Sequence, residues 1–123
     1  MTANNQNGFS LVETTIAMSL LVVAILGIAA VIVMMTSGND FSRRTTVAAT
    51  MAKDKIEEIK NTNYQQIATG GPETGTSIYT REWTVTSDVP DQNMKTIIVT
   101  VKWPWQGKER SVSLKTIIAS TQT

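Results

Sequence analysis

The sequence predicts an α+β protein in which a long N-terminal helix, membrane-spanning in its first half and amphipathic in its second, packs on a small three-stranded antiparallel meander. Three observations lead to this fold class. An apolar run follows Glu13, a pattern with helical spacing follows Asp40, and three runs of alternating apolar and polar residues fill the C-terminal part. With 123 residues, the chain has room for one domain beside the span.

The apolar run extends from Ile16 to Met35, twenty residues in which only Ser19 and Gly27 are not plainly apolar. A helix of that length spans about 30 Å, which is the hydrocarbon thickness of a bilayer. The rest of the chain is too small to surround a helix that is apolar on every side, so a membrane span is favoured over a buried core helix. A secretory signal peptide fits less well, since no basic residue precedes the run and no Ala-x-Ala follows it.

An acidic residue stands directly before the span, where an unpaired charge is costly. It closes the segment GFSLVE at residues 8–13. This segment resembles the prepilin motif of type IV pilins and type II secretion pseudopilins, and the resemblance is strong over about residues 7–35. It implies a leader peptide of residues 1–8, cleavage between Gly8 and Phe9 by a prepilin peptidase on the cytoplasmic face, and N-methylation of Phe9.

Physical chemistry gives Glu13 an assembly role within this resemblance. Cleavage would leave an α-ammonium group on Phe9, four residues before Glu13 and on the same face of a helix. The two groups can neutralise each other, within one subunit or between neighbours, and a buried pair costs far less than either charge alone. The alternative is that Glu13 merely flanks a signal anchor at the membrane interface.

The resemblance also implies how the chain is divided and where it lies. Residues 9–36 would form the transmembrane and assembly helix, and residues 37–123 an extracytoplasmic pilin-like domain. The protein would be a single-pass inner-membrane protein that later enters a pilus fibre or pseudopilus. The positive-inside rule, which counts Arg43 and Arg44 against no basic residue before the span, would by itself place this domain in the cytoplasm.

A polar stretch, Thr36–Asp40, follows the span and contains residues able to cap a new helix. From about residue 40 to 62 the pattern is amphipathic, with apolar positions that recur by fours and a charged opposite side. Asp54, Glu57 and Glu58 alternate with lysines, so we interpret them as a solvated helix face and not as a metal or acid–base site. This stretch is most similar to PilV-type minor pilins and minor pseudopilins.

The sheet is expected over about residues 76–120, after a loop at Thr69–Gly75. Each of its three runs has one apolar face: Tyr79, Trp83 and Val85; Ile97, Val99, Val101 and Trp103; Val112, Leu114, Thr116 and Ile118. Trp83 and Trp103 fall on the apolar faces of their runs, so we expect both in the core. For Trp105, in the expected turn from Pro104 to Lys108, an exposed interface role and simple turn packing remain equally open. Asp88 and Asp91 are only weak calcium candidates.

The sequence contains no cysteine and no histidine. This excludes disulfides, the commonest zinc sites, Cys-His catalysis and the Ser-His-Asp triad. The formal net charge of +1 gives no general attraction for nucleic acid, and the cations of residues 94–123 lack the spacing of a nucleic-acid groove. We therefore expect no enzymatic activity, no cofactor, no metal and no nucleic-acid partner.

The leading hypothesis is a structural minor subunit of a type IV pilus-like fibre, acting in pilus assembly or initiation. A minor pseudopilin of a type II secretion system is the alternative within the family, and a neighbouring secretin or ATPase gene would separate the two. An unrelated single-pass membrane protein with a small ligand-binding domain is the alternative of another class. The expected partners are other pilin or pseudopilin subunits, the prepilin peptidase/methyltransferase, the inner-membrane assembly machinery and membrane lipid.

Overall fold

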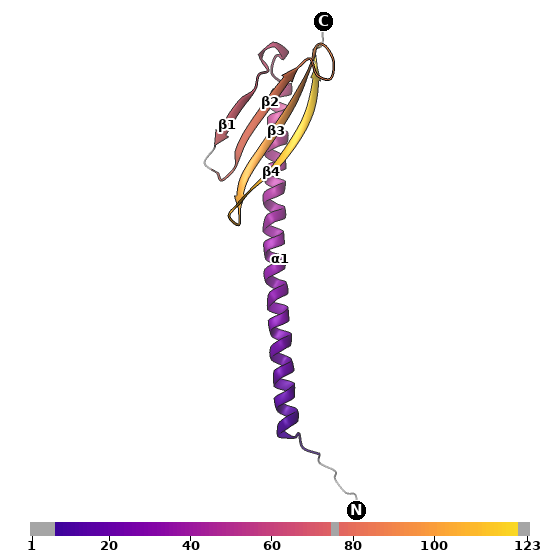
Figure 1. Cartoon of the computed structure of the whole chain (residues 1–123), viewed down its shortest axis with the longest axis vertical. Helices are drawn as coiled ribbons and strands as arrows, with labels where there is room; N and C mark the ends of the chain where they lie inside the picture. Colours follow the sequence, from indigo (N-terminus) through magenta and orange to yellow (C-terminus); the bar gives the residue numbers. More distant parts are fainter. Residues whose placement is uncertain (1–6, 75–76, 121–123) are drawn as a thin grey trace, which may run out of the picture. The chain divides into compact units, whose positions relative to one another are not determined.

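The computed structural model describes residues 7–74 and 77–120 (Figure 1). In chain order, its elements are helix α1 (Leu11–Lys60), the 3-10 helix η1 (Tyr64–Gln66), and strands β1 (Gly70–Thr74), β2 (Thr80–Ser87), β3 (Met94–Trp105) and β4 (Lys108–Ala119). The chain forms two compact units, an N-terminal unit that ends at Asn39 and a C-terminal unit that begins at Asp40.

The N-terminal unit is helical from Leu11 and is apolar on every side. All large apolar side chains from Phe9 to Met35 are between 52% and 86% exposed. The helix is long and apolar enough to cross a membrane. The polar stretch Thr36–Asp40, where we expected one helix to end and a new one to be capped, lies inside α1 and does not interrupt it.

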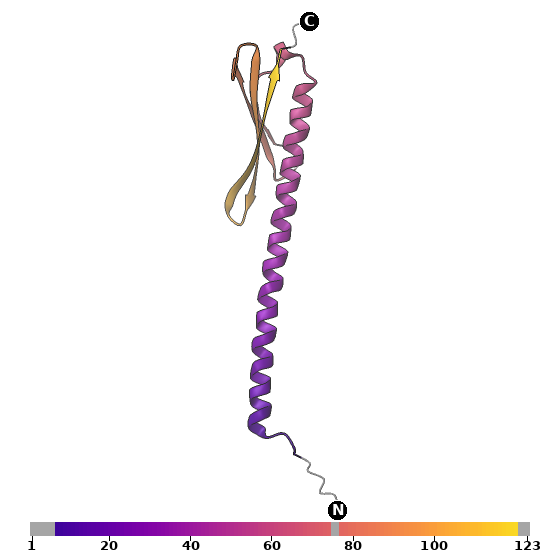
Figure 2. The ribbon, with the colours of Figure 1, turned by 90° about the vertical axis from the view of Figure 1, so that its right-hand side faces the viewer.

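The C-terminal unit consists of the second half of α1 packed against one face of an antiparallel sheet (Figure 2). The sheet has the strand order β1-β2-β3-β4, so each strand pairs with its neighbour in sequence. The α+β class is therefore confirmed, but the expected count of three strands is wrong, because the sheet has four. The additional strand is β1, which lies within the stretch Thr69–Gly75 that we expected to be a loop.

Two glycines allow β1 to lie close to β2. A Cβ atom at Gly70 would come within 2.5 Å of the Trp83 ring, and one at Gly71 within 2.8 Å of the Glu82 Cα atom. Gly71 also has a φ of 97°, which is strained for any residue with a side chain. Glycines are usually depleted in strands, so tertiary contacts and not local propensity produce β1.

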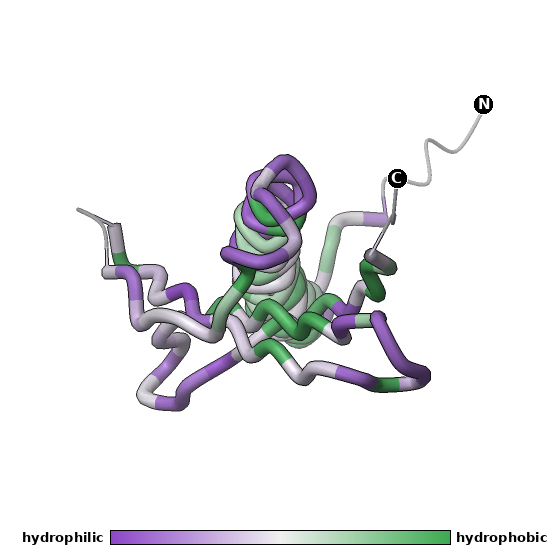
Figure 3. The backbone as a smooth tube through the Cα atoms, turned by 90° about the horizontal axis from the view of Figure 1, so that it is seen from above, coloured by the Kyte–Doolittle hydropathy of each residue, from purple (hydrophilic) through white to green (hydrophobic). Residues whose placement is uncertain are grey.

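The core lies between α1 and the sheet, and it follows the alternation of the strands. Its fully buried side chains from the sheet are Ile97, Val99, Val101 and Trp103, and α1 contributes Ala48, Ala52, Ile56 and Ile59. Viewed from above, hydrophobic segments of the sheet lie against the helix, and hydrophilic segments lie at the two lateral ends of the sheet (Figure 3). The core position of Trp103 is confirmed, whereas Trp83 is half-buried and packs against the edge of the core.

Short connections join β3 to its neighbours, two residues to β4 and six residues to β2. Gln106 and Gly107, with φ values of 47° and 73°, form the two-residue turn between β3 and β4, which is shorter than the expected turn from Pro104 to Lys108. In the turn between β2 and β3, the carboxylates accept backbone hydrogen bonds: Asp88 Oδ1 from Asn93 N at 3.2 Å and Asp91 Oδ1 from Gln92 N at 2.8 Å. These two aspartates therefore stabilise a turn.

Candidate processing and assembly segment

The expected cleavage site lies in an accessible stretch of backbone. Residues 7–10 are not helical, and both Gly8 and Phe9 are exposed, Phe9 by 86% of its surface. A Cβ atom at Gly8 would meet no heavy atom within 4 Å. Because the peptide bond between Gly8 and Phe9 is neither buried nor part of the helix, a protease can reach it without unfolding α1.

Ser10 caps the first turn of α1. Its Oγ atom accepts a hydrogen bond from Glu13 N at 3.2 Å, and its carbonyl oxygen accepts one from Thr14 N at 3.1 Å. Ser10 is thus the N-cap residue, and Glu13 occupies the third helical position. The spacing Ser-x-x-Glu is that of a capping box, a signal that was present in the sequence and that our reading of the motif missed.

Glu13 lies in the first helical turn, where its negative charge faces the positive end of the helix dipole. It forms no ion pair with any residue of the described segments 7–74 and 77–120. In the uncleaved chain Phe9 stands before the cap and outside the helix, so the shared helix face expected after cleavage stays a prediction. The carboxylate of Glu13 is therefore available to a partner outside the described chain.

The hydroxyl groups within the apolar half of α1 are all satisfied by the helix itself. Thr14, Thr15, Ser19 and Thr36 each donate a hydrogen bond to a backbone carbonyl three or four residues earlier, at 2.8 to 3.3 Å. An unsatisfied polar group is costly in lipid, and these bonds remove that cost. This half of α1 is therefore suited to a bilayer or to a bundle of apolar helices, and Glu13 is its only charged side chain.

The C-terminal unit contains a buried lysine that the sequence did not mark as special. Lys55, only 4% exposed, donates to Glu58 Oε1 at 2.9 Å and to Glu73 Oε1 at 3.0 Å, and its Nζ atom lies 3.9 Å from the centroid of the Trp83 ring. Arg81 Nε donates to Glu73 Oε2 at 3.0 Å. We call these five residues the Lys55 cluster.

The Lys55 cluster has a structural role. The hydrogen bond from Arg81, together with that from Lys55, lowers the pKa of Glu73 below its ordinary value of 4.5, so its carboxylate stays charged. Every charge in the cluster is paired, and Glu58 and Glu73 come from α1 and β1. Among the described residues, no three acidic side chains come together as a metal site. The cluster therefore fastens β1 to the helix.

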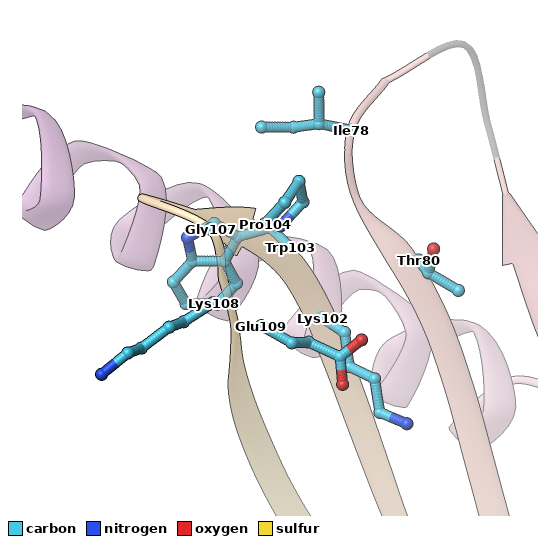
Figure 4. Close-up of a pocket in the computed structure, with 8 residues that line it drawn as sticks. All are labelled: Ile78, Thr80, Lys102, Trp103, Pro104, Gly107, Lys108 and Glu109. Atoms are coloured by element: carbon cyan, nitrogen blue, oxygen red, sulfur yellow. The ribbon is translucent and has the colours of Figure 1, made fainter.

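A shallow hollow of about 290 Å³ lies near the β3–β4 turn (Figure 4). Figure 4 shows Lys108 pointing away from Glu109 and Lys102, which extend in a common direction. Lys102 Nζ lies 2.6 Å from Glu82 Oε1, and this hydrogen bond raises the pKa of Lys102. Of the charged residues that line this hollow, Lys102 is therefore paired with a carboxylate of the neighbouring strand.

No protein-family model matches the chain, and no curated protein or solved structure is significantly similar to it. The pilin interpretation therefore depends on the residues of the motif and on the elements that the structure places around them. Of the expected site residues, Gly8 and Phe9 lie together in an accessible segment, and Glu13 lies on the first turn of the helix that follows.

Proposed function

We propose that this chain is a structural minor subunit of a type IV pilus-like fibre, cleaved between Gly8 and Phe9, N-methylated at Phe9, and active in fibre assembly or initiation. The observation that carries this proposal is the position of the scissile bond. It lies in exposed, non-helical backbone two residues before a helix whose following residues are apolar on every side. Exposed backbone outside a helix is where proteases cut, and the apolar helix that follows would hold this bond near the membrane surface.

The helix cap supports the role of Glu13. Cleavage creates an α-ammonium group on Phe9, one residue before Ser10. A positive charge at a helix N-terminus opposes the helix dipole, and a carboxylate in the first turn offsets it. When several such helices bundle away from water, the ammonium group of one subunit and the Glu13 carboxylate of another can pair, which removes the cost of burying either charge alone.

The two halves of α1 support a subunit that exists in two environments. The half up to Met35 has exposed apolar side chains and satisfied hydroxyl groups, so it suits lipid before assembly and neighbouring helices afterwards. The second half is already covered by the sheet of the C-terminal unit. The partners that follow are membrane lipid, the peptidase and methyltransferase, the assembly machinery and other pilin subunits.

Mass spectrometry of the mature N-terminus tests the proposal directly. The full chain is expressed in bacteria with and without a prepilin peptidase, and a known prepilin serves as the positive control. With the peptidase, the mature chain is expected to begin with N-methylated Phe9. An intact Met1 in cells that process the control prepilin would contradict the proposal.

Two glycine variants sharpen this test. Gly8→Val places a branched side chain at the expected cleavage site, whereas Gly27→Val places the same side chain in the span, and a Cβ atom at either position meets no heavy atom within 4 Å. The two positions are therefore matched in the free space around the added Cβ atom. Gly8→Val is expected to remain uncleaved, and Gly27→Val is expected to be cleaved like the wild type.

A further inference from the structure

The C-terminal unit carries a group of aromatic and basic side chains at one of its ends. At this end the β3–β4 turn lies beside the first helical residues of the unit (Figure 2). The group consists of Phe41, Arg43 and Arg44 from α1 together with residues 103–110, the segment WPWQGKER. We call it the hairpin foot.

Aromatic rings hold the hairpin foot together. The Trp105 ring centroid lies 5.7 Å from that of Phe41, and the Arg44 guanidinium carbon lies 5.2 Å from the Trp105 centroid. The Arg110 guanidinium carbon lies 5.9 Å from the centroid of Phe41. Trp105, whose role the sequence left open, is thus half-buried between helix and hairpin, with cationic side chains over the aromatic faces.

The hairpin foot has an excess of uncompensated positive charge. Residues 40–44 and 103–110 contain four cations and two carboxylates. Asp40 is paired with Arg44 at 3.2 Å, whereas Arg43, Lys108 and Arg110 form no ion pair with any residue of the described segments. Arg43 and Arg44 also line a hollow of about 320 Å³, together with Asp40, Val47 and Tyr79.

The opposite end of the same sheet has the opposite charge. The β2–β3 turn, residues 88–93, contains two aspartates and no cation. The twelve residues of β3 separate the two turns by about 40 Å at the usual rise per residue of a strand. The unit is therefore polarised along its strands, basic at the hairpin foot and acidic at the far turn.

The helical residues of the hairpin foot are among the first residues of the unit after the apolar run. Phe41 comes six residues after Met35, the last residue of that run. Six helical residues rise about 9 Å, and the headgroup layer on each side of a bilayer is about 5–8 Å thick. Long arginine side chains extend from such positions toward phosphate groups, and tryptophan is enriched at this depth.

We propose that the hairpin foot binds the anionic headgroups of phospholipids in the membrane that α1 spans. This binding would hold the C-terminal unit against the bilayer surface before the subunit enters a fibre. This inference rests on the proposed function, since it requires that the apolar half of α1 is inserted in a membrane. Three features favour lipid as the occupant: uncompensated cations, an aromatic side chain among them, and the short chain distance from the span.

The absence of cysteine from the sequence makes the test direct, because a single introduced thiol can carry a fluorophore. Ser111→Cys places the label directly after the last residue of the hairpin foot, and Gln92→Cys places it in the far turn; both positions are exposed. The full chain is reconstituted in vesicles of phosphatidylcholine with or without phosphatidylglycerol. Quenching of each fluorophore by headgroup spin-labelled lipid is then measured.

The label at Ser111→Cys is expected to be quenched more strongly in the anionic vesicles, and the label at Gln92→Cys is expected to be quenched equally in both. Raising the salt from 0.1 M to 1 M shortens the Debye length from about 10 Å to about 3 Å and should abolish the difference. Each basic residue near an anionic surface contributes roughly fivefold to association, so Lys108→Gln with Arg110→Gln should lower the ratio of docked to undocked units by about 25-fold.

The matched control is Lys53→Gln with Lys115→Gln, which removes the same charge outside the hairpin foot and should leave the quenching unchanged. Equal quenching at Ser111→Cys in both vesicle types would overturn the proposal, and so would equal effects of the two double variants. The first result would point to an acidic surface on another subunit as the occupant. Failure of the chain to insert in either vesicle would instead contradict the proposed function, which keeps the two failures apart.

Discussion

Lys55 Nζ lies 3.0 Å from Glu73 Oε1, and this ion pair joins α1 to the edge strand β1 across 18 residues of chain. Lys55 is 4% exposed, whereas the Glu73 side chain is 43% exposed. The pair therefore has a buried cation and a carboxylate that water can reach. A strand with two glycines and one proline has little tendency to form by itself, so the contact with Lys55 is a main reason for its position.

We predict that Glu73→Gln destabilises the C-terminal unit. Lys55 loses one of its two carboxylate partners, and Arg81 loses its only acidic partner among the described residues. Breaking a fully buried pair costs about 3–5 kcal/mol, but water reaches Glu73 and Lys55 keeps Glu58, so we expect a loss of about 1–2 kcal/mol. Urea unfolding of the full chain in detergent, followed by tryptophan fluorescence, measures this, because all three tryptophans lie in this unit.

Glu57→Gln is the matched control for this prediction. Glu57 is 61% exposed and lies 4.0 Å from Lys53, whose side chain is 72% exposed. Such a surface pair contributes about 0.5 kcal/mol or less. If both variants unfolded at the same urea concentration, the Lys55 cluster would not be what fastens β1.

The same carboxylate predicts how stability depends on pH. The hydrogen bond from Arg81, together with that from Lys55, lowers the pKa of folded Glu73 below its ordinary value of 4.5. A lowered carboxyl pKa contributes stability that is fully present above the unfolded pKa and is lost as the pH falls through the folded pKa. The free energy of unfolding should therefore fall as the pH drops below about 4.5, and more steeply for the wild type than for Glu73→Gln. Parallel curves for the two proteins would contradict this account.

Alanine substitutions at two glycines with positive φ distinguish the cost of backbone strain from the cost of a steric clash between strands. Gly71 has a φ of 97° and a Cβ atom there would lie 2.8 Å from Glu82 Cα, whereas Gly107 has a φ of 73° with no atom within 4 Å. Gly107→Ala should cost about 1–2 kcal/mol for the left-handed backbone alone. Gly71→Ala should cost more, because it also pushes β1 away from β2. Hydrogen exchange of the β1 amides measures this displacement, and equal protection in both variants would contradict it.

The sequence predicted those parts of the fold that depend on neighbouring residues, and it did not predict the parts that depend on contacts between distant residues. The alternation in β3 correctly placed Val99 and Trp103 in the core, because side chains point to opposite faces of a strand in turn. The strand β1 could not be found in this way, since it depends on Trp83 and Glu82 lying beside two glycines. The burial of Lys55 could not be found in this way either, because Lys55 pairs with Glu73, which is distant in sequence.

The candidate sites show the same difference. The segment from Gly8 to Glu13 was recognisable because it is contiguous, and its Ser10 cap also had a readable signal. The hairpin foot had no such signal in the sequence. Trp105 comes to lie beside Phe41 only because β3 pairs with β4 and the sheet packs on α1. Contiguous motifs can therefore be read from this sequence, whereas sites assembled by the sheet require the structure.

The assembly role of Glu13 is tested by two substitutions with different physical effects. Glu13→Ala removes both the charge and a side chain suited to the third position of the capping box. Glu13→Gln removes only the charge, because glutamine also suits that position and is similar in size. Both variants should insert in the membrane, since the loss of a charge favours partitioning into lipid.

In a fibre, the two variants should fail together if charge pairing is the cause. The α-ammonium group of a neighbouring subunit would lose its counter-charge in either variant, and an unpaired charge among bundled apolar helices is costly. Immunoblotting of sheared fibres from cells that also make wild-type subunits measures incorporation. If Glu13→Gln were incorporated as well as the wild type while Glu13→Ala was not, the cap and not the charge would be the function of Glu13. Normal incorporation of both would remove Glu13 from the assembly mechanism.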